Sequence, residues 1–172
     1  MTRFTNLIFS EAQIQAKVKH LAQLITADHL KNPDNPMEFI GLMNGALVFF
    51  ADLIRHLDFA IPVHTLKVQS YDKDTQGSVS IADGFDPKGK RVCIVDDILD
   101  TGNSLIALME AFTAQGAQEI LTCVLLDKGK SPVTADYVGF HCPDLWVVGY
   151  GMDYQQLYRN LPFIAELPPE LR

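Results

Sequence analysis

The sequence has no apolar run long enough to cross a membrane. Its longest unbroken apolar stretch, residues 46–51, ends at Asp52, whereas a transmembrane helix needs about 20 such residues. Arg3 near the start is not followed by an apolar stretch of signal-peptide length. We therefore expect a cytoplasmic protein that does not act at a membrane.

Cysteine and basic residues are also scarce. The three cysteines, Cys93, Cys123 and Cys142, form no C-x-x-C pair, and the five histidines are widely separated. This pattern argues against a disulfide framework and against a zinc site. The 14 basic and 21 acidic residues give a net charge of −7, which argues against a nucleic-acid surface. A phosphorylated small molecule stays possible, because backbone amides can bind a phosphate locally.

The chain otherwise has the composition of an ordinary globular protein. Of its 172 residues, 48% are apolar and 20% are charged, and one domain typically takes about 150 residues. The sequence shows no repeat, linker or low-complexity stretch. We therefore expect a single domain over residues 1–172.

Hydrophobic periodicity predicts alternating strands and helices. A Ser10–Gln13 capping box opens a helix that runs to about Leu30. Further helices are expected over residues 46–57 and 101–115, and strands over 38–42, 63–68, 91–95, 119–126, 135–140 and 145–148, with a possible strand pair near 79–81. This order predicts an α/β fold with a mostly parallel, twisted sheet flanked by helices. The loop-rich, aromatic segment after Tyr137 is expected to form a small hood lobe.

The most informative stretch joins an apolar strand to three carboxylates. Asp96 and Asp97 follow apolar residues 92–95, and Asp100 precedes a Thr-Gly-Asn-Ser turn at a predicted helix start. Carboxylates this close repel one another unless sugar hydroxyls or a metal ion compensate. Free amides at a helix start suit a phosphate. The segment therefore suits a ribose 5-phosphate group, with an ordinary acidic helix cap as the alternative.

A phosphoacceptor receiver domain is a competing interpretation of the same stretch. Receivers also place an acidic pair after a buried strand, where it binds a metal. In receivers, however, the pair lies near the start of the domain, whereas here Asp96 and Asp97 lie beyond the midpoint. Too little chain follows for the remaining strand–helix units.

Residues 94–104 resemble the phosphoribosyl-diphosphate signature of the type I phosphoribosyltransferases. Other blocks are similar to the hypoxanthine-guanine branch of that family, and they occur in the expected order from about residue 38 to the end of the chain. These blocks are residues 42–45 and 49–53, Ser70-Tyr71, and residues 126–128, 136–140, 146–154 and 159–161.

The resemblance implies a transfer reaction of purine salvage. A 5-phosphoribosyl group would pass from phosphoribosyl diphosphate to hypoxanthine or guanine, giving IMP or GMP and pyrophosphate, with Mg²⁺ as cofactor. Asp100 matches the general base at purine N7, and Asp96 and Asp97 match residues that bind the ribose hydroxyls. The residues implied to hold the 5-phosphate are Thr101, Gly102, Asn103 and Ser104.

The resemblance also assigns the other parts of the site. Pyrophosphate would be bound by Met43, Asn44, Gly45 and Arg159, and relatives have an unusual backbone here, so a strained or cis peptide is expected at Met43–Asn44. The purine would be bound by Lys128, Trp146, Val147 and Asp153. Ser70 and Tyr71 would form a lid, and Mg²⁺ would be held by Asp96, Asp97 and Asp153. Many relatives carry a basic residue where Asn44 and Asn103 stand.

Two other functions stay open at this point. One is a phosphoribosyltransferase that prefers xanthine, because the residues around Trp146 do not decide the preference at the purine 2-position. The other is a regulator on the same fold that binds nucleotides or RNA without catalysis, although the charge and Asp100 argue against it. The family also implies a homo-oligomer, either a dimer or a tetramer.

Overall fold

A computed structural model describes residues 4, 6–67 and 85–171 of the chain. The possible strand pair near residues 79–81 and the predicted lid residues Ser70 and Tyr71 lie outside these ranges.

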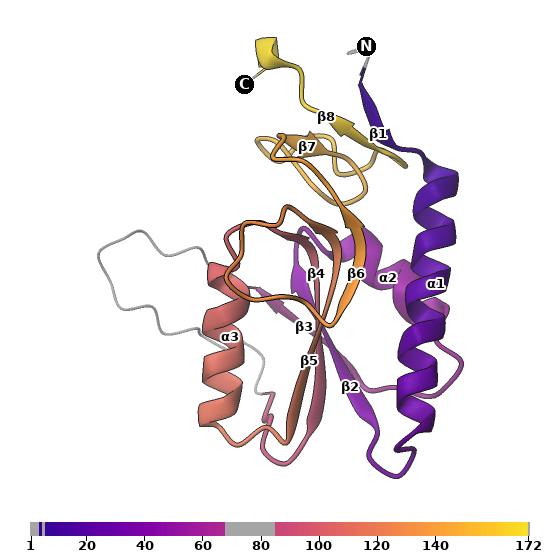
Figure 1. The fold of residues 1–172 in the computed structure, drawn as a ribbon, viewed down its shortest axis with the longest axis vertical. Coiled ribbons are helices and arrows are strands. Elements are labelled where there is room, and N and C mark those ends of the chain that lie inside the picture. The colour runs from indigo at the N-terminus through magenta and orange to yellow at the C-terminus, as the bar shows by residue number, and fades with distance from the viewer. Residues whose placement is uncertain (1–3, 5, 68–84, 172) are drawn as a thin grey trace.

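A five-stranded parallel sheet forms the centre of the molecule (Figure 1). Its strands lie in the order β3-β2-β4-β5-β6, and every adjacent pair is parallel. The strands are β2 (Met37–Met43), β3 (Val63–Lys67), β4 (Arg91–Leu99), β5 (Glu119–Asp127) and β6 (Tyr137–His141). The predicted parallel α/β sheet is therefore confirmed.

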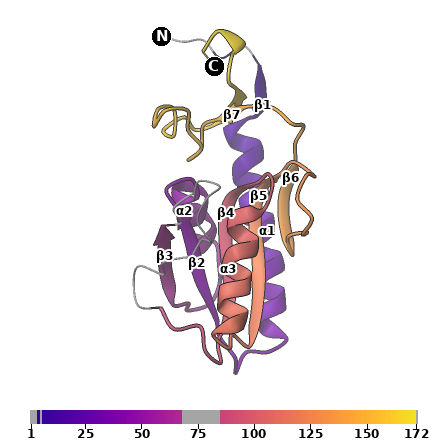
Figure 2. The same ribbon diagram turned by 90° about the vertical axis from the view of Figure 1, so that its left-hand side faces the viewer.

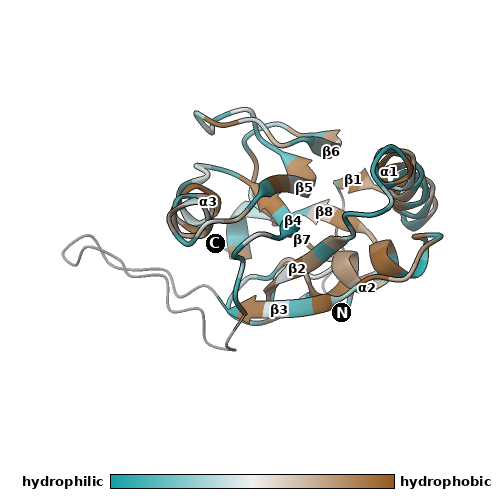
Figure 3. Ribbon diagram, turned by 90° about the horizontal axis from the view of Figure 1, so that it is seen from below, coloured by the Kyte–Doolittle hydropathy of each residue, from teal (hydrophilic) through white to brown (hydrophobic). Residues whose placement is uncertain are grey.

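Helices cover both faces of this sheet. Helices α1 (Glu11–Leu30) and α2 (Leu47–Arg55) pack on one face, and α3 (Asn103–Ala114) packs on the other (Figures 2 and 3). The alternation of side chains along β4 explains this layering, because successive strand residues point to opposite faces. Cys93 and Val95 belong to the core under α1 and α2, whereas Val92 and Ile94 pack under α3.

The predicted capping box starts α1. The Gln13 backbone N–H donates to the Ser10 hydroxyl at 3.3 Å, and the Ser10 N–H donates to Gln13 Oε1 at 2.9 Å. A cap of this kind stabilises a helix by about 1 kcal/mol. Both contacts form between residues three apart, which is why the sequence alone predicts them.

A second, smaller sheet forms the hood above the main sheet (Figure 1). It contains β1 (Leu7–Phe9), β8 (Ile164–Glu166) and β7 (Val147–Val148), paired antiparallel in that order, and the chain closes with a 3₁₀ turn, Pro169–Leu171. The predicted boundary after Tyr137 needs correction, because residues 137–141 pair with β5 in the main sheet. The prediction also missed β1 and β8, which have three residues each and are too short to show a period.

Two boundaries near the acidic segment also differ from the prediction. The strand expected over residues 91–95 continues to Leu99, because its pairing with β5 extends to Leu99 opposite Asp127. The helix expected from residue 101 begins at Asn103. Gly102 precedes it in a left-handed conformation, φ 78°, which glycine adopts without steric strain.

In the described part of the chain, no helix combines the length and the apolar character that crossing a bilayer requires.

Candidate active site

The loops after β2 and β4 meet where the strand order of the main sheet reverses. From β2 the chain goes to β3 on one side, while β4 lies on the other side of β2. In open α/β sheets, the crevice beyond the carboxyl ends of the strands at such a switch point is the usual ligand site. The topology therefore brings the Met43–Gly45 loop beside the Asp96–Ser104 segment.

The peptide bond between Met43 and Asn44 is cis, as the resemblance predicts. Gly45 follows directly and lies against the acidic end of β4. A Cβ atom at Gly45 would lie 2.2 Å from Asp97 Oδ2 and so could not be accommodated without a shift of the carboxylate. Only glycine allows this loop to approach the carboxylate so closely.

Asp96 and Asp97 are half-buried at the end of β4. Burial raises the pKa of the Asp96 carboxyl well above its usual range, and the neighbouring Asp97 charge adds to that shift. Burial also raises the pKa of Asp97, against the opposing effect of the nearby Arg159 guanidinium. Two carboxylates that lie side by side and away from solvent are unfavourable in their charged forms. They therefore accept hydrogen bonds or bind a cation favourably, because either one compensates the buried negative charge.

The turn between β4 and α3 forms a pocket of about 130 Å³, lined by Asp96 and residues 98–105. No side chain caps α3, because its N-cap residue is Gly102. The first amides of a helix lack partners within the helix, and together with the helix dipole they bind anions. A Cβ at Gly102 would also lie 2.3 Å from Ser131 Oγ. The pocket therefore suits a phosphate group.

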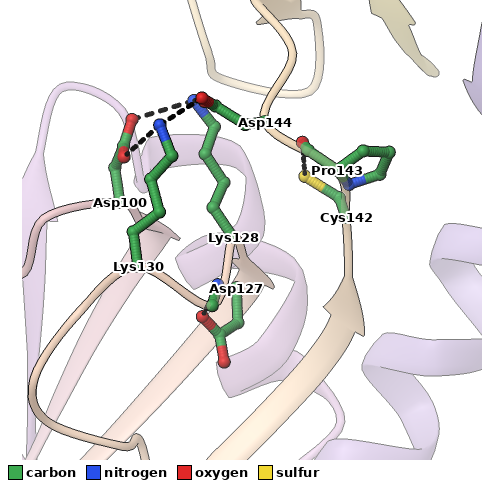
Figure 4. Close-up of polar contacts among 8 residues, drawn as sticks. Asp100, Asp127, Lys128, Lys130, Cys142, Pro143 and Asp144 are labelled. Carbon is green, nitrogen blue, oxygen red and sulfur yellow. Dashed lines mark hydrogen bonds and ion pairs between the residues drawn. The ribbon is translucent and has the colours of Figure 1, made fainter.

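Asp100 is one of the residues that line this pocket, and it pairs with a lysine from the loop after β5. Lys128 Nζ donates to Asp100 Oδ2 at 2.8 Å, and the Lys128 side chain is only 10% exposed. Figure 4 shows two further charged residues beside this pair, Lys130 and Asp144. Neither residue was predicted from the sequence, where the only local signal for Lys130 is its position two residues after Lys128.

The aromatic residue predicted to hold a base is accessible. Trp146 is 60% exposed, and its ring meets the Tyr154 ring edge-on at a centroid distance of 6.2 Å. Val147, the next residue, lies in β7 opposite Glu166. An exposed indole face next to a hood strand can stack on a flat heterocycle.

Arg159 and Asp153 form an ion pair within the hood. Arg159 Nη2 lies 2.7 Å from Asp153 Oδ1, and Arg159 Nη1 donates to the Gly151 carbonyl at 2.7 Å. The loop they fix packs against the loop after β2, because a Cβ at Gly151 would lie 2.2 Å from the Gly45 carbonyl oxygen. The hood and the Met43–Gly45 loop are therefore in direct contact.

The structure does not place the three predicted metal ligands in one cluster. Among the described residues, no group of three or more His, Cys, Asp or Glu side chains is arranged to hold a metal ion. Asp96 and Asp97 are adjacent, whereas Asp153 is engaged by Arg159 and by the Gln156 backbone N–H at 2.8 Å.

Fold and site together define an α/β protein with a small pocket between β4 and α3, an acidic strand end at the switch point of a parallel sheet and an exposed tryptophan in the hood. Residues 8–155 match the phosphoribosyl transferase domain family, and the chain belongs to that family. The fold class, the family resemblance and the enzymatic character predicted from the sequence are thereby confirmed. The receiver-domain interpretation has no support.

Individual relatives cover nearly the whole chain. The hypoxanthine-guanine phosphoribosyltransferase of Bacillus subtilis is 41% identical over 170 residues, which are 95% of this chain and 93% of that protein. A crystal structure of a hypoxanthine phosphoribosyltransferase from Staphylococcus aureus is similar with a TM-score of 0.89 at 34% identity, over 98% of this chain and 94% of that one. A hypoxanthine phosphoribosyltransferase from Trypanosoma cruzi, in a ternary substrates complex, gives a TM-score of 0.88 at 34% identity, over 98% and 97% of the two chains.

Proposed function

We propose that this protein is a purine-salvage enzyme that transfers the 5-phosphoribosyl group of phosphoribosyl diphosphate to hypoxanthine or guanine. The contact that carries the proposal is the 2.8 Å pair of Lys128 and Asp100. An ammonium donates to a 6-oxo group, and a carboxylate accepts the proton that a purine carries at N7. The pair therefore offers both partners that a 6-oxopurine needs, a donor for the 6-oxo group and an acceptor for the N7 proton.

In this proposal the acidic end of β4 binds the sugar. Asp96 and Asp97 accept hydrogen bonds from the ribose hydroxyls, which compensates their buried charge. The 5-phosphate occupies the pocket of about 130 Å³, where Thr101, Gly102, Asn103 and Ser104 bind it. Asn103 adds no cation where many relatives have one, so backbone amides supply most of the binding.

The transfer forms a bond from the ribosyl carbon to purine N9 and breaks the bond from that carbon to pyrophosphate. As positive charge develops on the ribosyl carbon, the N7 proton passes to Asp100, which acts as the general base. The departing pyrophosphate is bound by the Met43, Asn44 and Gly45 backbone and by Arg159. The purine stacks on Trp146, and the Val147 backbone binds the edge of the purine opposite the one that Lys128 contacts. Asp153, which the ion pair with Arg159 holds in place, lies beside the base.

Gly45→Ala tests the pyrophosphate assignment. The added Cβ meets the Asp97 carboxylate at 2.2 Å, so the loop or the carboxylate must move. Because displacements of about 1 Å can lower turnover by roughly 10²-fold, we expect a loss of about 10- to 10²-fold in kcat/KM for phosphoribosyl diphosphate. The KM for hypoxanthine should change much less. A variant with normal phosphoribosyl diphosphate kinetics would contradict the assignment.

The acidic end of β4 fits Mg²⁺. Asp96 and Asp97 offer two adjacent carboxylates whose buried negative charge a cation would compensate. Mg²⁺ requires oxygen ligands and is usually held by one or two carboxylates together with substrate phosphates, so a three-carboxylate cluster is not needed. Asp153 would join only by releasing Arg159. When bound, the ion would neutralise charge on the diphosphate.

Removal of divalent metal tests this cofactor. With excess EDTA, turnover of hypoxanthine is expected to fall, because the diphosphate then leaves with uncompensated charge. Addition of MgCl₂ beyond the chelator should restore the rate, whereas NaCl at equal ionic strength should not. Undiminished turnover in excess chelator would show that Mg²⁺ is not required.

A substrate panel tests the function itself. Hypoxanthine, guanine, xanthine and adenine are each incubated with phosphoribosyl diphosphate and Mg²⁺, and pyrophosphate release is measured. We expect turnover of hypoxanthine and guanine and very little of adenine. Faster turnover of xanthine would establish the xanthine-preferring alternative, and no turnover of any base would favour the non-catalytic regulator.

Three further parts of the proposal come from the sequence and from the family. We propose a single domain over residues 1–172, a cytoplasmic location and a homo-oligomer, either a dimer or a tetramer; light scattering after size-exclusion chromatography measures the last. The lid proposed for Ser70 and Tyr71 concerns residues outside the described ranges.

A further inference from the structure

Lys130 and Asp144 complete a ring of alternating charges with Asp100 and Lys128 (Figure 4). Lys128 Nζ lies 2.8 Å from Asp100 Oδ2 and 3.7 Å from Asp144 Oδ1. Lys130 Nζ contacts Asp144 Oδ2 and lies 3.8 Å from Asp100 Oδ1. Each lysine thus faces both carboxylates, and the chemistry proposed above uses only two of the four groups.

The four groups differ in exposure. The Lys128 side chain is 10% exposed, whereas Asp144 is 59% exposed. A charge that is nine-tenths buried is unfavourable unless an opposite charge lies close to it. Lys128 therefore depends on nearby carboxylates far more than Asp144 depends on its lysine partners.

Proton transfer removes one of the two carboxylates that Lys128 faces. When the N7 proton reaches Asp100, that side chain becomes a neutral acid. Among the ion pairs of the described residues, the only other carboxylate within 4 Å of Lys128 Nζ is Asp144. Asp144 must then compensate the buried ammonium while Lys128 donates to the 6-oxo group.

We propose that Asp144 is a positioning residue for the transfer reaction: it holds the Lys128 ammonium directed at the 6-oxo group as Asp100 takes up the proton. Lys130 in turn holds Asp144 in place. This inference rests on the proposed function, because it requires Asp100 and Lys128 to act on a purine.

The local backbone supports this assignment. The Lys128 N–H donates to the Leu99 carbonyl at 3.0 Å, and Asp127 Oδ1 accepts the Gly129 N–H at 2.8 Å, so the lysine loop is tied to the end of β4. Asp144 comes from the connection between β6 and the hood strand β7. The hydrogen bond from Lys130 lowers the pKa of the Asp144 carboxyl below its usual range, in agreement with a close ion pair.

Asp144→Asn in two backgrounds tests the proposal. In the otherwise unchanged enzyme, kcat for hypoxanthine should fall about five- to tenfold, because the remaining partner of a buried charge loses its compensation. The KM for phosphoribosyl diphosphate should not change. In the Lys128→Ala background the same substitution should change kcat less than about twofold, because coupled residues are not additive. Asp144→Glu should recover most of the rate.

Matched controls separate this role from a structural one. Asp34→Asn removes the same charge from an exposed residue that precedes β2, at the opposite end of the strands, and should leave kcat unchanged. Lys130→Met should lower kcat in the same way as Asp144→Asn, but by a smaller factor. Thermal unfolding of each variant checks that the fold is kept.

The outcomes distinguish the inference from the proposed function. An active enzyme in which Asp144→Asn leaves kcat unchanged would overturn the inference alone. Equal losses with and without Lys128 would do the same, because they would show an effect that does not pass through that lysine. A wild-type protein that converts no 6-oxopurine would overturn the proposed function, and the inference with it.

Discussion

Replacement of Asp100 by asparagine is expected to lower kcat for hypoxanthine by a factor of about 10²–10⁴, the range by which a general base accelerates proton transfer. The amide has nearly the shape of the carboxylate but does not accept the N7 proton. It also leaves Lys128 without its 2.8 Å charge partner, so the lysine faces Asp144 at 3.7 Å alone. The KM for phosphoribosyl diphosphate should change far less, because the residues proposed to bind its 5-phosphate, Thr101 to Ser104, are unchanged.

Steady-state kinetics with hypoxanthine at saturating phosphoribosyl diphosphate measures this effect. The loss should appear in kcat, because a general base acts in the chemical step. Asp34→Asn is the matched control, with the same substitution on a distant exposed residue. If Asp100→Asn turned over hypoxanthine at the normal rate, Asp100 would not be the general base of the reaction.

Replacement of Lys128 by alanine is expected to remove most of the discrimination between 6-oxopurines and adenine. A protonated lysine is a donor only, so it pairs with a 6-oxo group in a charge-assisted hydrogen bond. Adenine presents an amino group at that position and would leave a side chain that is 10% exposed without a substrate acceptor. Sites built to pair a polar substrate group discriminate by roughly 10⁴.

The measurement is kcat/KM for hypoxanthine, guanine and adenine in both proteins. Lys128→Ala should lower the values for hypoxanthine and guanine and bring them closer to the value for adenine. Lys31→Ala is the control, because Lys31 is 76% exposed at the end of α1 and contacts no site residue. Efficient use of adenine by the unchanged protein, or normal hypoxanthine kinetics in Lys128→Ala, would mean that another group binds the 6-position.

The hydrophobic pattern predicted the main sheet because that pattern is local. The Ser10–Gln13 box, the period of α1 and the apolar strand before Asp96 each depend on neighbours a few residues apart. The strand nevertheless ended too early in the prediction, at residue 95. Polar side chains at Asp96 and Asp97 broke the apolar run, whereas the backbone pairing with β5 does not depend on side-chain polarity and continues to Leu99.

The chemical character of the site was also present in the sequence, since the acidic segment and the turn after it are contiguous. The tertiary structure alone decided which distant residues complete it. It placed Gly45 against Asp97, Gly151 against the Gly45 carbonyl and Asp144 beside Lys128. It also paired β1, from the start of the chain, with β8 in the hood sheet. Such contacts arise where loops from different strands meet at one edge of a sheet, and no local period or spacing encodes that meeting.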